Sequence, residues 1–192
     1  KRNRWPHPLN EDFNDLIRNT VKIYGIGSRQ DYNLLLECKS YLKSRISGLI
    51  DHKIRRDTEE YYKAMNLKIV HGFRKDEAER HQLLNKCSFV LCVGNWLQDS
   101  DAEQQYRMAI MLGKPIFEMR HESSISLSNI IRYLQPVRPI KDDKWDTTKM
   151  DDILIYETPE GLLELMDGNH RHEFANRVGG VSSLSGWIIK QV

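Results

Sequence analysis

Short apolar runs alternate along this chain with longer stretches of helical periodicity, and few folds accommodate that alternation. Four of the runs are rich in β-branched and aromatic residues, which is typical of strands. They span residues 21–27, 67–70, 88–94 and 115–119. The stretches between them have apolar residues at helical spacing, and they include residues 57–65, 76–86 and 101–112. Parallel neighbouring strands need a crossover long enough to hold a helix, so the sequence predicts an α/β fold: a doubly wound, mostly parallel sheet with helices on both faces.

The remainder of the chain predicts a fifth strand over residues 153–156 and a helix after it. Thr158, Pro159 and Gly168 are typical of a helix N-cap, a first helical position and a helix stop. A shorter helix is expected at residues 129–134. We therefore expect one five-stranded domain over residues 1–168, followed by a C-terminal tail or oligomerisation arm over residues 169–192.

Length and charge narrow the class of protein. The chain has 192 residues, enough for one ordinary α/β domain. Its 29 Lys and Arg against 27 Asp and Glu give a formal net charge of +2, which argues against a nucleic-acid partner. No run approaches 18 apolar residues, and no apolar segment follows the charged start, which argues against export and against a membrane partner.

Cysteine and histidine usage bears on compartment and cofactors. Cys38, Cys87 and Cys92 cannot all pair within one chain, and none has the close spacing of a metal site, so we expect a cytoplasmic protein. His170 and His172 lie two residues apart without a third ligand nearby in the sequence, which is more typical of an exposed strand or loop than of a metal site. We predict no metal and no other cofactor.

The first predicted strand leads into the loop Gly-Ile-Gly-Ser-Arg-Gln at residues 25–30. Ligands of open parallel sheets bind at the carboxyl ends of the strands. Gly25 and Gly27 would let backbone N–H groups approach an anion, while Ser28 and Arg29 would add a hydroxyl and a guanidinium, so the loop suits a phosphate. It is not a dinucleotide fingerprint, because Gln30 stands where the third glycine would be. A tight strand-to-helix turn explains the same residues without a ligand.

A second candidate segment, residues 94–114, leaves the third strand and enters a helix. Asp99 or Asp101 can cap that helix without any catalytic role. At about 100° per residue, Gln105 shares the stripe of Ala102, Ala109 and Leu112 that faces the sheet, whereas Glu103 points almost the opposite way. A buried Gln105 needs hydrogen-bond partners, and it could contact a ligand or satisfy a loop carbonyl. Trp96 could stack on a base or sugar, or cap the core.

These residues resemble the nucleoside 2-deoxyribosyltransferase superfamily, which includes the deoxynucleoside 5′-monophosphate N-glycosidases. The opening strand and its Gly-Ile-Gly-Ser-Arg end resemble the family's first phosphate-and-sugar loop, and residues 86–93 resemble the lead-in to its buried third strand. The family pattern W-x-x-S-x-G-A-x-x-E-x-x-x-A-x-x-x-G-K-P is matched at Trp96, Ala102, Ala109, Gly113, Lys114 and Pro115. The resemblance covers about residues 21–119.

The resemblance implies a Rossmann-like or flavodoxin-like fold and hydrolysis or transfer at the N-glycosidic bond of a nucleoside 5′-monophosphate. Family members attack the anomeric carbon with a Glu and pass the glycosyl-enzyme intermediate to water or another base. It further implies a homodimer or larger assembly whose neighbour completes the pocket. Carried onto this chain, the catalytic positions are Gln105 and Asp99, and the substrate-binding positions are Gly25, Gly27, Ser28, Arg29, Gly94, Trp96 and Asp101.

Position 105 departs from the family pattern. In that pattern the nucleophilic Glu is the third residue after the first Ala and the eighth before the Gly of G-K-P, and both distances lead to Gln105 in this chain. An amide has nearly the shape of Glu but lacks the charge that stabilises the oxocarbenium-like transition state. We therefore expect Gln105 to preserve substrate binding while turnover is lost. The amide could be an engineered change that traps substrate, a favoured interpretation because the rest of the motif is intact. It could be natural, in a silent nucleotide-binding or sensing module. Alternatively, the catalytic carboxylate is Glu103, Asp99 or Asp101, although Glu103 is turned about 200° around the helix from Gln105.

Overall fold

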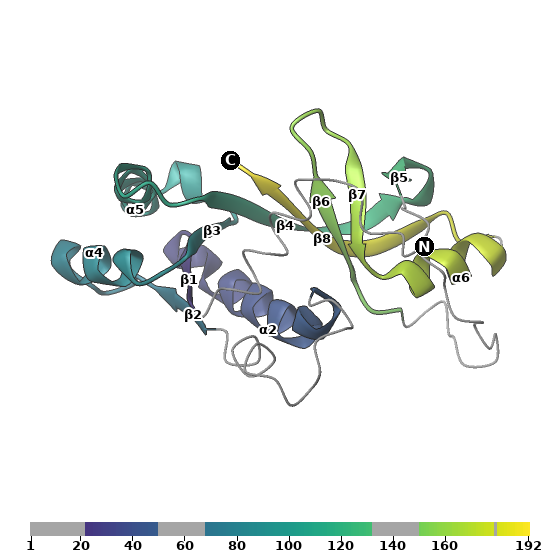
Figure 1. Ribbon diagram of the computed structural model, residues 1–192, viewed down its shortest axis with the longest axis horizontal. Helices are drawn as coiled ribbons and strands as arrows, with labels where there is room; N and C mark the ends of the chain where they lie inside the picture. Colours follow the sequence, from purple (N-terminus) through teal and green to yellow (C-terminus); the bar gives the residue numbers. More distant parts are fainter. Residues whose placement is uncertain (1–21, 50–67, 132–149, 179) are drawn as a thin grey trace, which may run out of the picture. The chain divides into compact units, whose positions relative to one another are not determined.

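The computed structural model describes residues 22–49, 68–131, 150–178 and 180–192 (Figure 1). The chain divides into two compact units. Among the described residues, the first unit comprises 22–49, 68–119 and 191–192, and the second comprises 120–131, 150–178 and 180–190. The predicted boundary at residue 168 does not coincide with this division.

The first unit is built on parallel strands in the order β2-β1-β3-β4. The strands are β1 (Lys22–Ile26), β2 (Lys68–His71), β3 (Phe89–Val93) and the start of β4 (Ile116–Ser126). In register, Ile23 lies beside Ile69 on one side and Phe89 on the other. The connections hold η1 (Arg29–Asp31), α2 (Tyr32–Leu49), α4 (Glu77–Asn85), η2 (Trp96–Gln98) and α5 (Ser100–Met111). The prediction of parallel strands joined by helices is therefore confirmed for this part of the chain. The helix expected at residues 57–65 lies outside the described residues.

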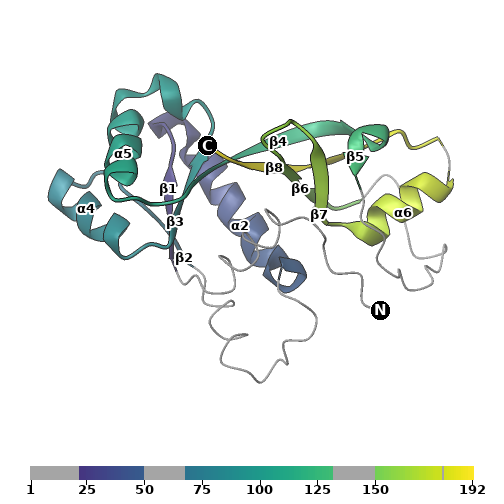
Figure 2. The same cartoon turned by 45° about the horizontal axis from the view of Figure 1, so that its top comes forward.

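Alternation along β1 separates the helices onto two faces (Figure 2). A Cβ built on Gly25 would lie 2.6 Å from a methyl of Leu35 on α2, so this face packs closely against α2. Tyr24 points the other way, into a cluster with Leu84 of α4 and Ala102 of α5. The first turn of α5 lies near the carboxyl ends of β2 and β3, because α5 follows β3 and Arg80 bonds both to Asp101 of α5 and to the Gly72 carbonyl just after β2.

The second unit contains a hairpin where a helix was predicted. Its elements are η3 (Leu127–Asn129), β5 (Ile130–Ile131), β6 (Ile153–Glu157), β7 (Leu163–Asp167), α6 (Asn169–Val178) and β8 (Ser183–Gln191). The helix expected over residues 158–168 is absent: β6 and β7 are antiparallel neighbours joined by a turn. The Thr158 hydroxyl accepts from the Leu162 N–H at 3.1 Å, and Gly161 has φ +82°. The residues expected to cap and start a helix thus close a turn instead.

The segment expected as a tail or arm folds into α6 and β8. Ile153 of β6 lies beside Gly186 of β8 in parallel register, and a Cβ on Gly186 would lie 2.6 Å from the Ile153 carbonyl oxygen. The helix expected at residues 129–134 is also absent where the chain is described, since η3 and β5 occupy residues 127–131. Ile153, Ile155, Leu165, Ala175 and Ile188 belong to the core of this unit.

The predicted mostly parallel, five-stranded, doubly wound sheet is therefore wrong, although the chain is still α/β. Among the described residues the strands number eight, in the order β2-β1-β3-β4-β8-β6-β7-β5, and the antiparallel β6 and β7 make the sheet mixed. The error arose because pairing between distant strands decided the C-terminal part of the fold. Among the described helices, none is long and apolar enough to cross a membrane.

Candidate functional site

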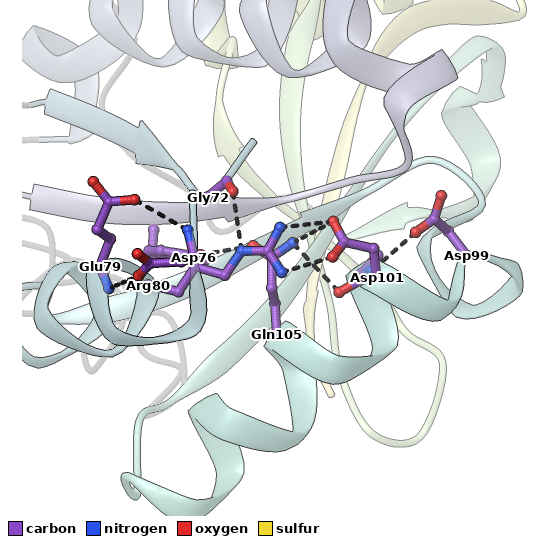
Figure 3. A network of polar contacts seen from close by, with 9 residues as sticks. Gly72, Asp76, Glu79, Arg80, Asp99, Asp101 and Gln105 are labelled. Atoms are coloured by element: carbon purple, nitrogen blue, oxygen red, sulfur yellow. Dashed lines mark hydrogen bonds and ion pairs between the residues drawn. The ribbon is translucent and has the colours of Figure 1, made fainter. Parts of the chain in front are cut away.

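Gln105 lies at the centre of a polar network inside the first unit (Figure 3). Its side chain faces the sheet from α5 and the residue is only 2% exposed, as the helical stripe predicted. The Tyr24 hydroxyl of β1 donates to Gln105 Oε1 at 2.6 Å. Gln105 Nε2 donates to the Asp101 carbonyl at 3.4 Å and to Asp101 Oδ2 at 3.3 Å. Both ends of the amide are therefore satisfied within the protein.

Arg80 of α4 connects this network to the end of β2. Its Nε donates to the Gly72 carbonyl at 3.0 Å, and its two terminal nitrogens donate to the Asp101 carboxylate at 2.6 and 2.9 Å (Figure 3). Asp76 and Glu79 form a capping box that fixes the start of α4 one turn from Arg80. The Arg80 side chain is 10% exposed and that of Asp101 is 37% exposed, so the pair lies at the edge of the buried region. Asp101 therefore accepts hydrogen bonds from both Arg80 and Gln105.

The partners of Gln105 fix the orientation of its amide. Burial raises the pKa of Tyr24, so its phenol stays protonated and donates to the Gln105 oxygen. The Asp101 carboxylate accepts both hydrogen bonds from Arg80, so it requires the amide nitrogen of Gln105 on its side. A Glu at position 105 would instead place a carboxylate oxygen against both the carbonyl and the carboxylate of Asp101. The site therefore favours an amide over a carboxylate.

Gly72, immediately after β2, leaves room for the hydrogen bond between Tyr24 and Gln105. A Cβ on Gly72 would overlap the Tyr24 hydroxyl and would lie 2.5 Å from Gln105 Oε1. A side chain at this position would have to displace at least one of these two groups. Gly72 is thus a structural requirement of the network.

A carboxylate, that of Asp31, directly follows the predicted phosphate loop at residues 25–30. Asp31 Oδ2 accepts from the Ser28 hydroxyl at 2.6 Å and from the Asn95 N–H at 3.1 Å. A Cβ on Gly94, which has φ +62°, would collide with the same carboxylate. The Asp31 N–H bonds to the Ser28 carbonyl at 3.0 Å. Because Asp31 already occupies these donors and carries a negative charge, the turn suits hydroxyl groups of a ligand better than a phosphate.

The other predicted positions divide between packing and exposure. Gly25 is covered by Leu35, and Gly27 lies beside Val93, so both glycines serve close packing here. Arg29 is exposed at the same turn. Ser28 caps η1 by accepting from the Asp31 N–H.

Two more predicted residues serve the start of α5 and the core. Asp99 is the N-cap of α5 and accepts from the Ala102 N–H at 2.9 Å. Trp96 is 2% exposed and packs on Tyr106 with ring centroids 4.7 Å apart. The structure brings Gln105 and Asp101 into contact. Helix capping explains Asp99 and core packing explains Trp96 without a bound ligand.

Comparison of the chain with protein-family models, curated proteins and solved structures found no match. The candidate site is therefore argued from its own geometry. In the part of the chain that the structure describes, no group of three or more His, Cys, Asp and Glu could hold a metal ion.

Reasoning from sequence missed four participants: Tyr24, Asp31, Gly72 and Arg80. Arg80 is buried, although arginine is usually exposed, and its partner Asp101 is 21 residues away in the sequence. Asp31 lies one residue beyond the predicted loop, and the sequence does not reveal its bonds to Ser28 and Asn95. Tyr24 carried the one available signal, because a phenol inside a buried strand requires a hydrogen-bond partner.

Proposed function

We propose that the first unit is a nucleotide-binding module that takes a nucleoside 5′-monophosphate and leaves its N-glycosidic bond intact. The observation that carries this proposal is the Gln105 amide, which is buried and bonded at both ends by Tyr24 and Asp101. At this position the resembling enzymes use a Glu nucleophile. An amide held in this way has neither the charge nor the freedom to attack a sugar.

The proposed ligand would lie at the carboxyl ends of β1, β2 and β3, where parallel sheets bind small molecules. Ser28 and Asp31 offer a hydroxyl and a carboxylate that suit sugar hydroxyls, and the exposed Arg29 guanidinium suits a phosphate. The connection from β3 to α5 reaches both groups of residues, because Asn95 bonds to Asp31 and Asp101 bonds to Gln105.

N-glycosidase or deoxyribosyltransferase activity is the second candidate. One observation favours it: the Tyr24 phenol is aimed at the side-chain oxygen of position 105, where it would equally well hydrogen-bond a carboxylate nucleophile. In this alternative a carboxyl at position 105 restores chemistry.

The two candidates separate in a binding and turnover experiment on the full chain. Ribo- and deoxynucleoside 5′-monophosphates are titrated by calorimetry, and each mixture is then analysed for free base by chromatography. The same measurements are made on Gln105→Glu, with Glu103→Gln as a control on the exposed face of the same helix. Mass spectrometry of the denatured protein identifies any nucleotide that purifies with it.

The proposal expects a bound nucleotide that is recovered unchanged from the parent and from Gln105→Glu. Free base released by a folded Gln105→Glu protein would replace the proposal with the second candidate. If no nucleoside monophosphate binds the parent, both candidates fail.

A further inference from the structure

A cavity of about 400 Å³ lies beside the edge strand β2 of the first unit. Apolar side chains of α2, β2 and α4 line it, among them Leu35, Leu36, Ile69 and Leu83. Its volume falls in the range of pockets that enclose small molecules. None of the residues that line it belongs to the network around Gln105, so this inference does not rest on the proposed function.

Aromatic rings line one part of the cavity. His71 and Tyr32 line it, and their rings meet edge-on with centroids 5.4 Å apart. Phe73 supports both rings, at 5.1 Å from His71 and 5.4 Å from Tyr32. Arg74, with φ +58°, belongs to the turn that follows. Such a group of rings favours a flat, aromatic occupant over an aliphatic one.

His71 also has an unsatisfied ring nitrogen. Its Nδ1 is buried without a hydrogen-bond partner, and buried polar atoms in that condition are rare in native proteins. This atom is closed to solvent, so the rest of the His71 side chain provides the contact with the cavity.

The charged residues at the cavity are both cations. Lys39 of α2 and Lys75 after β2 line it, and no carboxylate is found among the described residues that do so. Burial lowers the pKa of His71, and the positive charges of Lys75 and Lys39 lower it further, so the imidazole is neutral at pH 7. Two ammonium groups beside a neutral ring complement an anion.

We propose that this cavity binds a small ligand in which a flat aromatic ring carries one anionic group. The ring occupies the apolar and aromatic part beside His71, and the anion pairs with Lys39 and Lys75 at the opening.

Phenyl phosphate tests the proposal because it joins the two required features. Inorganic phosphate has the anion without a ring, and benzyl alcohol has the ring without an anion. Titrations of the full chain are followed by NMR of the His71 ring signals, assigned with His71→Gln. We expect phenyl phosphate to shift these signals and to bind at least about fivefold more tightly than either fragment. The double variant Lys39→Gln/Lys75→Gln should weaken binding about fivefold or more.

Lys68→Gln is the matched control, because Lys68 is an exposed lysine on the same strand that does not line the cavity. It should bind phenyl phosphate as the parent does. The proposal is overturned if phenyl phosphate leaves the His71 signals unchanged, if benzyl alcohol binds equally well, or if the folded double lysine variant keeps the parent affinity. The Lys39→Gln/Lys75→Gln variant should leave the nucleotide titrations unchanged, because neither lysine belongs to the network around Gln105, so failure of the nucleotide proposal is distinguishable from failure of this one.

Discussion

Replacing Gln105 by Glu should destabilise the protein in a pH-dependent way. The change exchanges the amide nitrogen that lies 3.3 Å from Asp101 Oδ2 for an oxygen. Two carboxylates at that separation repel each other by about 5 kcal/mol at an effective dielectric constant of about 20. Protonation of the introduced carboxyl relieves that repulsion, because a neutral carboxyl can donate to Asp101 as the amide does.

The cost of protonation sets the upper limit of the effect. Each pH unit above the reference Glu pKa of about 4.3 costs about 1.36 kcal/mol, so keeping the introduced carboxyl neutral at pH 7 costs about 3.7 kcal/mol. Arg80 offsets part of the repulsion. We therefore expect a loss of about 2–4 kcal/mol in the free energy of unfolding at pH 7.

The sign of the pH dependence follows from the direction of the pKa shift. Burial beside Asp101 raises the pKa of the introduced carboxyl in the folded state above its unfolded value. The variant should therefore match the parent below a pH of about 4.3, lose stability as the pH rises through the folded pKa, and then remain constant. Urea unfolding of parent and variant between about pH 4 and pH 8 measures the difference.

Two further variants make the test specific. Glu103→Gln changes the same kind of side chain at an exposed surface pair with Arg107, and we expect less than about 0.5 kcal/mol. Asp101→Asn combined with Gln105→Glu restores one amide and one carboxylate, so the double variant should be less destabilised than the sum of its single variants. A pH-independent difference of less than about 0.5 kcal/mol for Gln105→Glu would refute the reasoning.

Three other perturbations follow from the packing of both units. Gly72→Ala should lower the free energy of unfolding by about 2 kcal/mol or more in urea titrations, and Tyr24→Phe in the same chain should recover part of that loss, since it removes one of the two groups that the new methyl meets. Gly186→Ala should lower the free energy of unfolding by a similar amount, because its Cβ meets the Ile153 carbonyl. The control Ser182→Ala, at an exposed residue just before β8, should change it by less than about 0.5 kcal/mol, and equal stabilities of the two variants would contradict the β6–β8 pairing. Burial raises the pKa of Cys38 to about 12 and that of Cys87 to about 11, and that of Cys92 also rises, so none of the three thiols should react with a disulfide reagent at about pH 8 until urea unfolds the chain; rapid reaction of the folded protein would argue against their burial.

Local patterns predicted the first unit closely. The run at residues 88–94 is β3 (Phe89–Val93), and the stretch at 101–112 is α5 (Ser100–Met111). These elements follow from side-chain periodicity, which is encoded within about ten neighbouring residues. The same periodicity placed Gln105 on the buried face of α5.

The helix predicted in the second unit is wrong because strands that are distant in the sequence pair there. Thr158, Pro159 and Gly168 suit the ends of a helix, and Leu163 and Leu165 suit its buried face, yet residues 163–167 form a strand. Pairing with β6 and β5 outweighed the local preference. The candidate site has the same limit, because Arg80 reaches Asp101 and Tyr24 reaches Gln105 only after three elements have assembled.

The absence of a side chain at Gly72 links three positions that are far apart in the sequence. A relative of this protein that keeps the hydrogen bond between the phenol and the amide must also keep glycine at the position of Gly72. A relative that loses this bond is free to replace the tyrosine, the glycine and the glutamine. Tyrosine in the first strand, glycine after the second and glutamine in the helix after the third should thus be inherited or lost as a set. Such a triplet offers a way to trace ancestry where overall resemblance between sequences has faded.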